Sequence, residues 1–280
     1  MNKSIHLIDR NNSKDNCSFS KTEIIIKAED TGEVLFKGRN KVVLPGGLTT
    51  AKSHFGSNLK AGSILMDTVL KKYSYDQYLD AKTVPDGGTE DSDGEIVRLF
   101  AVGSDGCDLS AIKAKTAKYK DYLKITENPG LVDGLIPFIA EDETTNSENK
   151  YFGKRTFTFD SKAKVHYLFK TIEGYSSNLI TTNGVTCSET DLPLASNIDD
   201  LEFYVSVNLK ISDKECRSLF NQVGSDVKRI NSISLLTARK KVVNNVPYYY
   251  NIRPLTKLNF TNEFLVEGNK SLDITYNIYY

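Results

Sequence analysis

The chain has 280 residues, enough for one large domain or two moderate ones, and a globule of this size can bury its core without a metal or a disulfide. Lys and Arg together number 36, and Asp and Glu together also number 36, so the formal net charge is zero. A balanced chain has no overall field that attracts nucleic acid or an anionic membrane, so neither is an expected partner.

The four cysteines stand far apart, at positions 17, 107, 187 and 216. This spacing fits neither a zinc site nor a small disulfide framework, and it predicts free thiols in a reducing compartment. The first residues are polar, and no apolar run approaches the length of a transmembrane helix. We therefore expect a protein that is made and assembled in a cytoplasm.

In the first part of the chain the spacing of apolar residues changes from that of strands to that of helices. Residues 1–20 are polar and predict a flexible N-terminal arm. Residues 22–28 and 34–37 predict two strands joined by a turn at 29–32, and residues 41–44 extend the sheet until Pro45. Apolar residues at helical spacing then predict a helical insertion near 48–80.

An acidic, glycine-rich loop follows the helical insertion. Asp91, Asp93 and Glu95 alternate in it, which suggests a calcium loop, but the remaining positions of the EF-hand pattern are missing. A solvated surface loop is therefore the favoured interpretation. Residues 96–102 predict a strand, and the apolar run 135–140 with Pro137 predicts an edge strand or an extended crossing.

The second half predicts mostly strands. Residues 155–159 and 164–172 form a predicted hairpin, and residues 175–197 a long polar connection with a strand near 179–182. In residues 201–211 the apolar side chains occupy every second position, which a strand, and not a helix, places on one face. Ser212 and Glu215 then form a capping-box pattern, which predicts a short helix near 213–223.

The C-terminal residues predict four more strands. These are residues 230–239, 247–250, 255–260 and 271–280, with a turn at Asn244 and Asn245. The fold class predicted is α+β and β-dominated: an antiparallel sheet or sandwich with the helical insertion near 48–80 and the short helix near 213–223. The chain divides into the arm 1–20, a mixed α/β region 21–140 and a mainly β region 141–280, either as separate cores or as one shared core.

No pattern in the sequence indicates catalysis. His6, His54 and His166 are the only histidines, and none stands in a catalytic or metal-binding motif. The carboxylates at 141–143 and 199–200 lie in loop-like stretches, where solvation explains them better than a glycosidase pair. A lysine cluster at 113–124, with Tyr119 and Tyr122 inside it, is more typical of a solvated face than of a nucleic-acid site. We predict no catalytic residue, no cofactor and no metal, and hence no enzyme.

The tyrosines give the strongest indication of function. Tyr248, Tyr249 and Tyr250 are consecutive, so a strand places rings on both of its faces, and Tyr279 and Tyr280 end the chain. A soluble monomer rarely keeps aromatic surface exposed without a partner, so these five residues are candidate interface residues. The alternative is that they cap the core with their hydroxyls in water.

Several segments of the chain, in this order, resemble structural proteins of tailed-bacteriophage particles, of the tail, baseplate or neck type. The resemblance covers roughly two-thirds of the chain and rests on the sequences at 40–47, 136–138, 150–155, 167–170, 219–221, 231–236 and 272–279. It implies a virion component, most plausibly of the tail or baseplate, that binds other virion proteins and copies of itself and has no catalytic residues. Two alternatives stay open: a receptor- or carbohydrate-binding β-sandwich module of the virion, and a structural protein of the neck or head.

Overall fold

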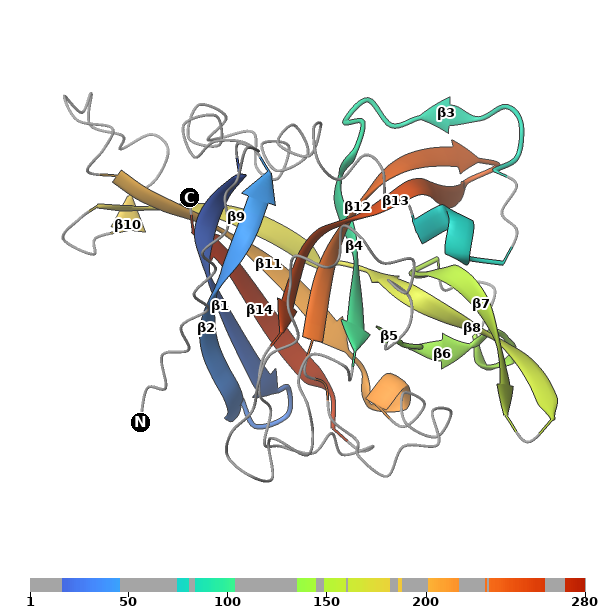
Figure 1. Ribbon diagram of the computed structural model, residues 1–280, viewed down its shortest axis with the longest axis horizontal. Coiled ribbons are helices and arrows are strands. Elements are labelled where there is room, and N and C mark those ends of the chain that lie inside the picture. The colour runs from blue at the N-terminus through green and yellow to red at the C-terminus, as the bar shows by residue number, and fades with distance from the viewer. Residues whose placement is uncertain are drawn as a thin grey trace.

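The computed structural model describes residues 17–45, 75–80, 84–103, 135–144, 149–159, 161–181, 186–187, 201–216, 230, 232–259 and 270–279. In these residues strands dominate, and every pairing between the described strands is antiparallel. They form two sheets, called sheet A and sheet B here (Figure 1). The prediction of a β-dominated, antiparallel fold is therefore confirmed.

Sheet A has six described strands in the order β10-β9-β11-β14-β1-β2. They are β1 (Cys17–Ala28), β2 (Val34–Pro45), β9 (Gly174–Thr181), β10 (Thr186–Cys187), β11 (Leu201–Ile211) and β14 (Leu272–Tyr279). The first strand of the chain pairs with the last, Ile24 opposite Tyr276. Residues from both sides of position 140 thus share one sheet.

Sheet B has eight described strands, in the order β13-β12-β4-β8-β6 with three more strands attached. They are β3 (Thr89–Glu90), β4 (Ile96–Gly103), β5 (Leu135–Ile136), β6 (Ile139–Ala140), β7 (Tyr151–Phe159), β8 (Lys162–Thr171), β12 (Ser232–Val243) and β13 (Val246–Asn259). The segment predicted as an edge strand or crossing becomes β5 and β6 on either side of Pro137. β5 pairs with β4 and β6 pairs with β8, so this segment bridges the two longer strands. β4 and β8 pair directly with each other through only two residues each.

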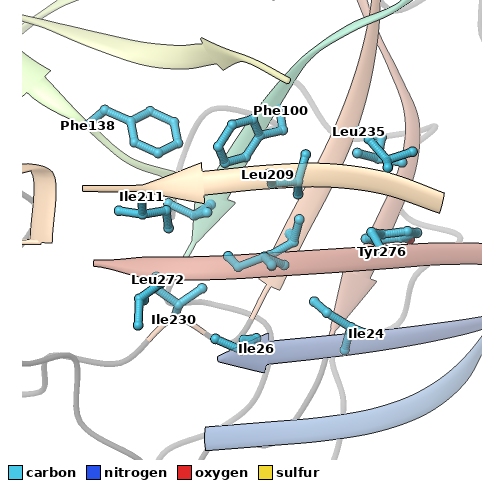
Figure 2. Close-up of a cluster of buried hydrophobic side chains, with 14 of the residues drawn as sticks. Ile24, Ile26, Phe100, Phe138, Leu209, Ile211, Ile230, Leu235, Leu272 and Tyr276 are labelled. Atoms are coloured by element: carbon cyan, nitrogen blue, oxygen red, sulfur yellow. The ribbon is translucent and has the colours of Figure 1, made fainter. Parts of the chain in front are cut away.

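The apolar core lies between the two sheets. Figure 2 shows side chains of β1, β11 and β14 meeting Phe100, Phe138 and Leu235 of sheet B. In β11 the predicted alternation holds, because Val205, Val207, Leu209 and Ile211 are buried and the residues between them are more exposed. The rings of Phe100 and Phe138 pack edge to face with centroids 5.1 Å apart, which adds to the burial energy.

The outer face of sheet B carries a second, smaller cluster. Tyr75 of the 3₁₀ turn η2 (Tyr75–Tyr78) is buried there, and its ring packs against Phe169 with centroids 5.2 Å apart. The side chain of Asp76 accepts hydrogen bonds from the backbone N–H groups of Asn251 and Ile252. The turn is therefore fastened to β13 while it covers the sheet.

The polar residues of β11 join a row of side chains on the other face of sheet A. Ser206 hydrogen-bonds Asn277 of β14 (2.7 Å), and Asn277 donates to Glu23 of β1 at 3.4 Å. Glu23 also pairs with Lys37 of β2 at 3.3 Å. Cross-strand pairs of this kind help to hold the register of neighbouring strands.

Three predicted elements differ from the structure. Residues 17–20, assigned to the arm, belong to β1, where Cys17 pairs with Pro45. The strand predicted near 179–182 within the polar connection is longer and begins earlier, as β9, because Ser176 and its neighbours pair with β11. The two strands predicted at 247–250 and 255–260 are one strand, β13, which continues through Pro254 by means of bulges.

The two predicted helices are described only in part. Most of the insertion near 48–80 lies outside the described residues, and its described end is the 3₁₀ turn η2. Residues 213–216 are helical, as predicted, and residues 217–223 lie outside the described part of the chain. The capping box is confirmed, since Ser212 Oγ accepts the N–H of Glu215 and the carboxylate of Glu215 accepts the N–H of Ser212.

Candidate functional site

A buried polar cluster lies where the two sheets meet and is the most unusual chemical feature of the described residues. Its centre is the ion pair between Lys170 Nζ and Glu215 Oε2, 2.9 Å apart, with side chains 2% and 0% exposed. Tyr151 donates its hydroxyl to Glu215 Oε1, and Lys170 also donates to the carbonyl of Lys210 at 2.6 Å. The capping box had singled out Glu215, but nothing in the sequence singled out Lys170.

Both oxygens of the Glu215 carboxylate are occupied by hydrogen bonds within the protein. The Glu215 carboxylate accepts hydrogen bonds from Tyr151, Lys170 and the N–H of Ser212. Next to it, burial raises the pKa of the Cys216 thiol to about 12, so the sulfur stays protonated at neutral pH. A protonated, buried thiol is a poor nucleophile and a poor metal ligand.

His166 is the one described histidine, and it is fully buried on β8. Its Nδ1 lies 3.0 Å from the carbonyl of Lys164, which makes Nδ1 the donor and leaves the lone pair on Nε2. Nε2 is buried and has no hydrogen-bond partner, and the ring packs edge to face against Phe157. Burial lowers the pKa of His166, so the neutral imidazole is the native form.

The low pKa of His166 predicts a stability that depends on pH. The unfolded chain binds a proton more readily than the folded one, so stability is complete above about pH 6.5 and falls as pH drops from there towards the folded pKa. We expect the free energy of unfolding to fall by up to about 1.4 kcal/mol per pH unit in that window. Urea unfolding at several pH values checks this, and His166→Phe should remove this part of the slope. An unchanged slope in the variant would contradict the assignment.

The acidic residues at 141–143 form the 3₁₀ turn η5 (Glu141–Glu143) and are exposed, as predicted. They are also paired: Lys154 binds Glu141 at 2.5 Å, and Lys164 binds Asp142 and Glu143 at 3.1 and 3.2 Å. The hydrogen bonds to these carboxylates raise the pKa of both lysines. The three carboxylates of the turn are therefore held in ion pairs on the surface.

The acidic loop at 91–95 is a folded junction between β3 and β4. Asp91 accepts the N–H of Asp93 and binds Arg98 at 3.0 Å, and the hydrogen bond to Asp93 is the main cause of its lowered pKa. Glu95 accepts a hydrogen bond from Thr237 at 3.0 Å and lies 3.7 Å from Arg253. These carboxylates hold the loop against sheet B, and no group of three potential metal-ligating side chains occurs among the described residues.

Tyr248, Tyr249 and Tyr250 lie on β13, and all three are partly exposed. Tyr249 packs against Phe152 with ring centroids 4.4 Å apart, and burial raises the pKa of its hydroxyl. Tyr250 donates its hydroxyl to Glu90 of β3 at 2.5 Å. By the alternation of a strand, Tyr248 and Tyr250 share the face opposite Tyr249.

The remaining candidates are described only in part. Tyr279 pairs with Tyr204 in sheet A, but the position of its side chain is not described, and Tyr280 lies outside the described residues. His6, His54, the carboxylates at 199–200 and the lysine cluster at 113–124 also lie outside them. In the described part of the chain, no helix is long and apolar enough to cross a membrane.

Comparison with known proteins finds no matching family model, no matching curated protein and no matching solved structure.

Proposed function

We propose that this protein is a structural component of a tailed-bacteriophage particle, in the tail or baseplate, and that it acts by binding other particle proteins and copies of itself. The observation that carries the proposal is the tyrosine-bearing strand β13 at the margin of sheet B. The sequence resemblance suggests the class of particle, and the arrangement of β13 suggests the surface that binds other subunits.

β13 presents tyrosines from a rigid support. It pairs with β12 along its length and ends the order of sheet B. Tyr249 anchors the strand on Phe152, while Tyr248 and Tyr250 keep part of their rings exposed on the opposite face. Partly exposed tyrosines on an ordered strand offer large contact area at a low entropic cost, which is typical of protein–protein interfaces.

Among the described strands β13 pairs with β12 alone, and its other edge is protected against simple strand addition. Pro247 and Pro254 lack N–H groups, and Asp76 accepts the N–H groups of Asn251 and Ile252. Asn251 also has φ +51°, which bends the strand at a bulge. We therefore propose that neighbours bind β13 through side chains, and that any joining by added strands uses other edges.

The described charged and reactive groups are consistent with assembly as the function. Lys170 and Glu215 hydrogen-bond each other in the core, Cys216 stays protonated, and the carboxylates of the exposed turn η5 form ion pairs with lysines. The segments that carry the resemblance coincide with framework strands, among them β7, β8, β12 and β14.

The tyrosine face provides a direct test. We expect Tyr248→Ala/Tyr250→Ala to lower incorporation into particles by about thirtyfold or more, because two or more kcal/mol is typical for aromatic hot spots. The measurement is quantitative mass spectrometry of particles purified from cells that make the tagged chain. The thermal midpoint of the free variant should stay near that of the unchanged protein, since both rings are partly exposed.

Two controls make the result specific. Tyr250→Phe keeps the ring and removes only the hydroxyl that hydrogen-bonds Glu90, and Val34→Ala trims an exposed side chain at the start of β2. Both should be incorporated normally. Full incorporation of the double variant would contradict the proposed interface, and retention of the free protein on host cells, lost in that variant, would favour the receptor- or carbohydrate-binding alternative.

A further inference from the structure

We propose that the buried Lys170–Glu215 pair is a conformational latch that fixes how sheet A and sheet B are placed on one another. It contributes specificity to the packing of the sheets and little to net stability. The inference concerns the fold itself, so it does not depend on the proposed function.

The cluster spans the two sheets. Lys170 lies on β8 of sheet B, and Tyr151 lies beside it on β7. Glu215 lies in the helical residues 213–216 that directly follow β11 of sheet A. The ammonium group of Lys170 reaches both this carboxylate and the Lys210 carbonyl of β11, so one side chain joins sheet B to β11 and to the helical residues that follow it.

The burial energy of the apolar core does not by itself favour one placement of the sheets over another. The side chains between the sheets are mainly Ile, Leu, Val and Phe, and hydrophobic burial is not directional. The hydrogen bonds of the cluster are directional, because each needs a short distance and a favourable angle. A shift of one sheet on the other would leave a charge buried without its partner.

The cost of an unpaired buried charge is what makes the pair a latch. Removing one member of a buried ion pair is strongly destabilising, whereas replacing both by uncharged groups of similar size is often neutral. Another placement of the sheets has the same effect as removing one member, because Lys170 and Glu215 stay buried and lose their contact. The pair therefore favours the native placement over other placements of the sheets, even if it adds nothing to the free energy of unfolding.

A double-mutant cycle tests this inference. We compare Lys170→Met, Glu215→Gln and the double variant by urea unfolding. Gln keeps one oxygen that can accept the N–H of Ser212, and its NH₂ group can donate to the Tyr151 hydroxyl. Each single variant should lose on the order of a hundredfold or more in the folding equilibrium constant, and the double variant should recover to within about tenfold of the unchanged protein. A double variant that loses as much as the two single variants combined would overturn the inference.

A second readout separates specificity from stability. The double variant should show weaker near-ultraviolet circular dichroism, bind the dye ANS and exchange the amide hydrogens of residues 212–216 faster. The matched control is Lys154→Met/Glu141→Gln, which removes an exposed ion pair from neighbouring β7 and should change none of these signals. If the single variants do not fold, the double variant decides alone: a folded but loosely packed protein supports the latch. A double variant that is unfolded, or as ordered as the unchanged protein by all three signals, overturns it.

Discussion

Gly153→Ala is expected to lower the free energy of unfolding by about 2 to 5 kcal/mol, from left-handed backbone strain and overpacking together. Gly153 lies in β7 with φ +75°, a conformation that residues with a Cβ adopt at a cost. An added Cβ would also overlap the ring of Phe169, which is fully buried and packed against Tyr75. Because the ring is fully buried, either the ring or the strand must shift to admit the Cβ.

Two other glycines distinguish backbone strain from overpacking. Gly32 has φ +68° with no atom near the added Cβ, and Gly174 has neither the positive φ nor a neighbour within 4 Å. We expect Gly32→Ala to cost about 1 to 2 kcal/mol from strain alone, and Gly174→Ala to have little effect. Urea unfolding of the three variants gives the order. If Gly153→Ala cost no more than Gly32→Ala, the close packing of Phe169 on β7 would be wrong.

Phe100→Ala is expected to cost about 3 to 5 kcal/mol, because it removes a fully buried ring from the core between the sheets. The ring contacts Phe138 of sheet B and shares its cluster with residues of β1, β11 and β14. Because this core takes side chains from early and late parts of the chain, the whole protein should unfold in one transition at lower urea. The unfolding transitions followed by tyrosine fluorescence and by far-ultraviolet circular dichroism should coincide.

The control is Val34→Ala, which trims a side chain that is 51% exposed and should change stability by less than about 0.5 kcal/mol. Two separate transitions, of which Phe100→Ala shifts only one, would show that the sheets fold as independent units. That outcome would contradict a core shared between them.

The elements with a strict period were predictable from the sequence. The alternation in β11 and β14 is complete enough to give both the strand and its buried face, and the pair Ser212 and Glu215 marks where the helix begins. The twin asparagines at 244 and 245 have φ +50° and +65°, as a tight hairpin turn requires. In each case the signal is local, so no distant partner is needed to interpret it.

The strands that were predicted too short or divided depend on distant partners. β9 contains Ser176 and other polar residues that favour no strand by themselves, and it becomes one because β11 pairs with it. β13 looked broken at Pro254, since nothing near it in the sequence shows that this residue lies at a bulge on the edge of a sheet. Tertiary pairing overrides local preference in both.

The buried cluster could not be predicted from the sequence for a similar reason. Lys170 resembles every other lysine of the chain, and its partner Glu215 lies 45 positions further on. The capping role of Glu215 was visible because it is local, whereas its ion pair is not. The tyrosines of β13 were visible as a triplet, but the anchoring of Tyr249 on Phe152 depends on a strand almost 100 residues earlier.

The most direct test of assembly as the function is a cryo-electron microscopy reconstruction of the phage particles made by cells that carry this gene. The account predicts that the chain occupies a defined position in the tail or baseplate, with Tyr248 and Tyr250 of β13 buried against a neighbouring subunit. Particles that are complete without the chain, while the protein remains free in the cell, would contradict it.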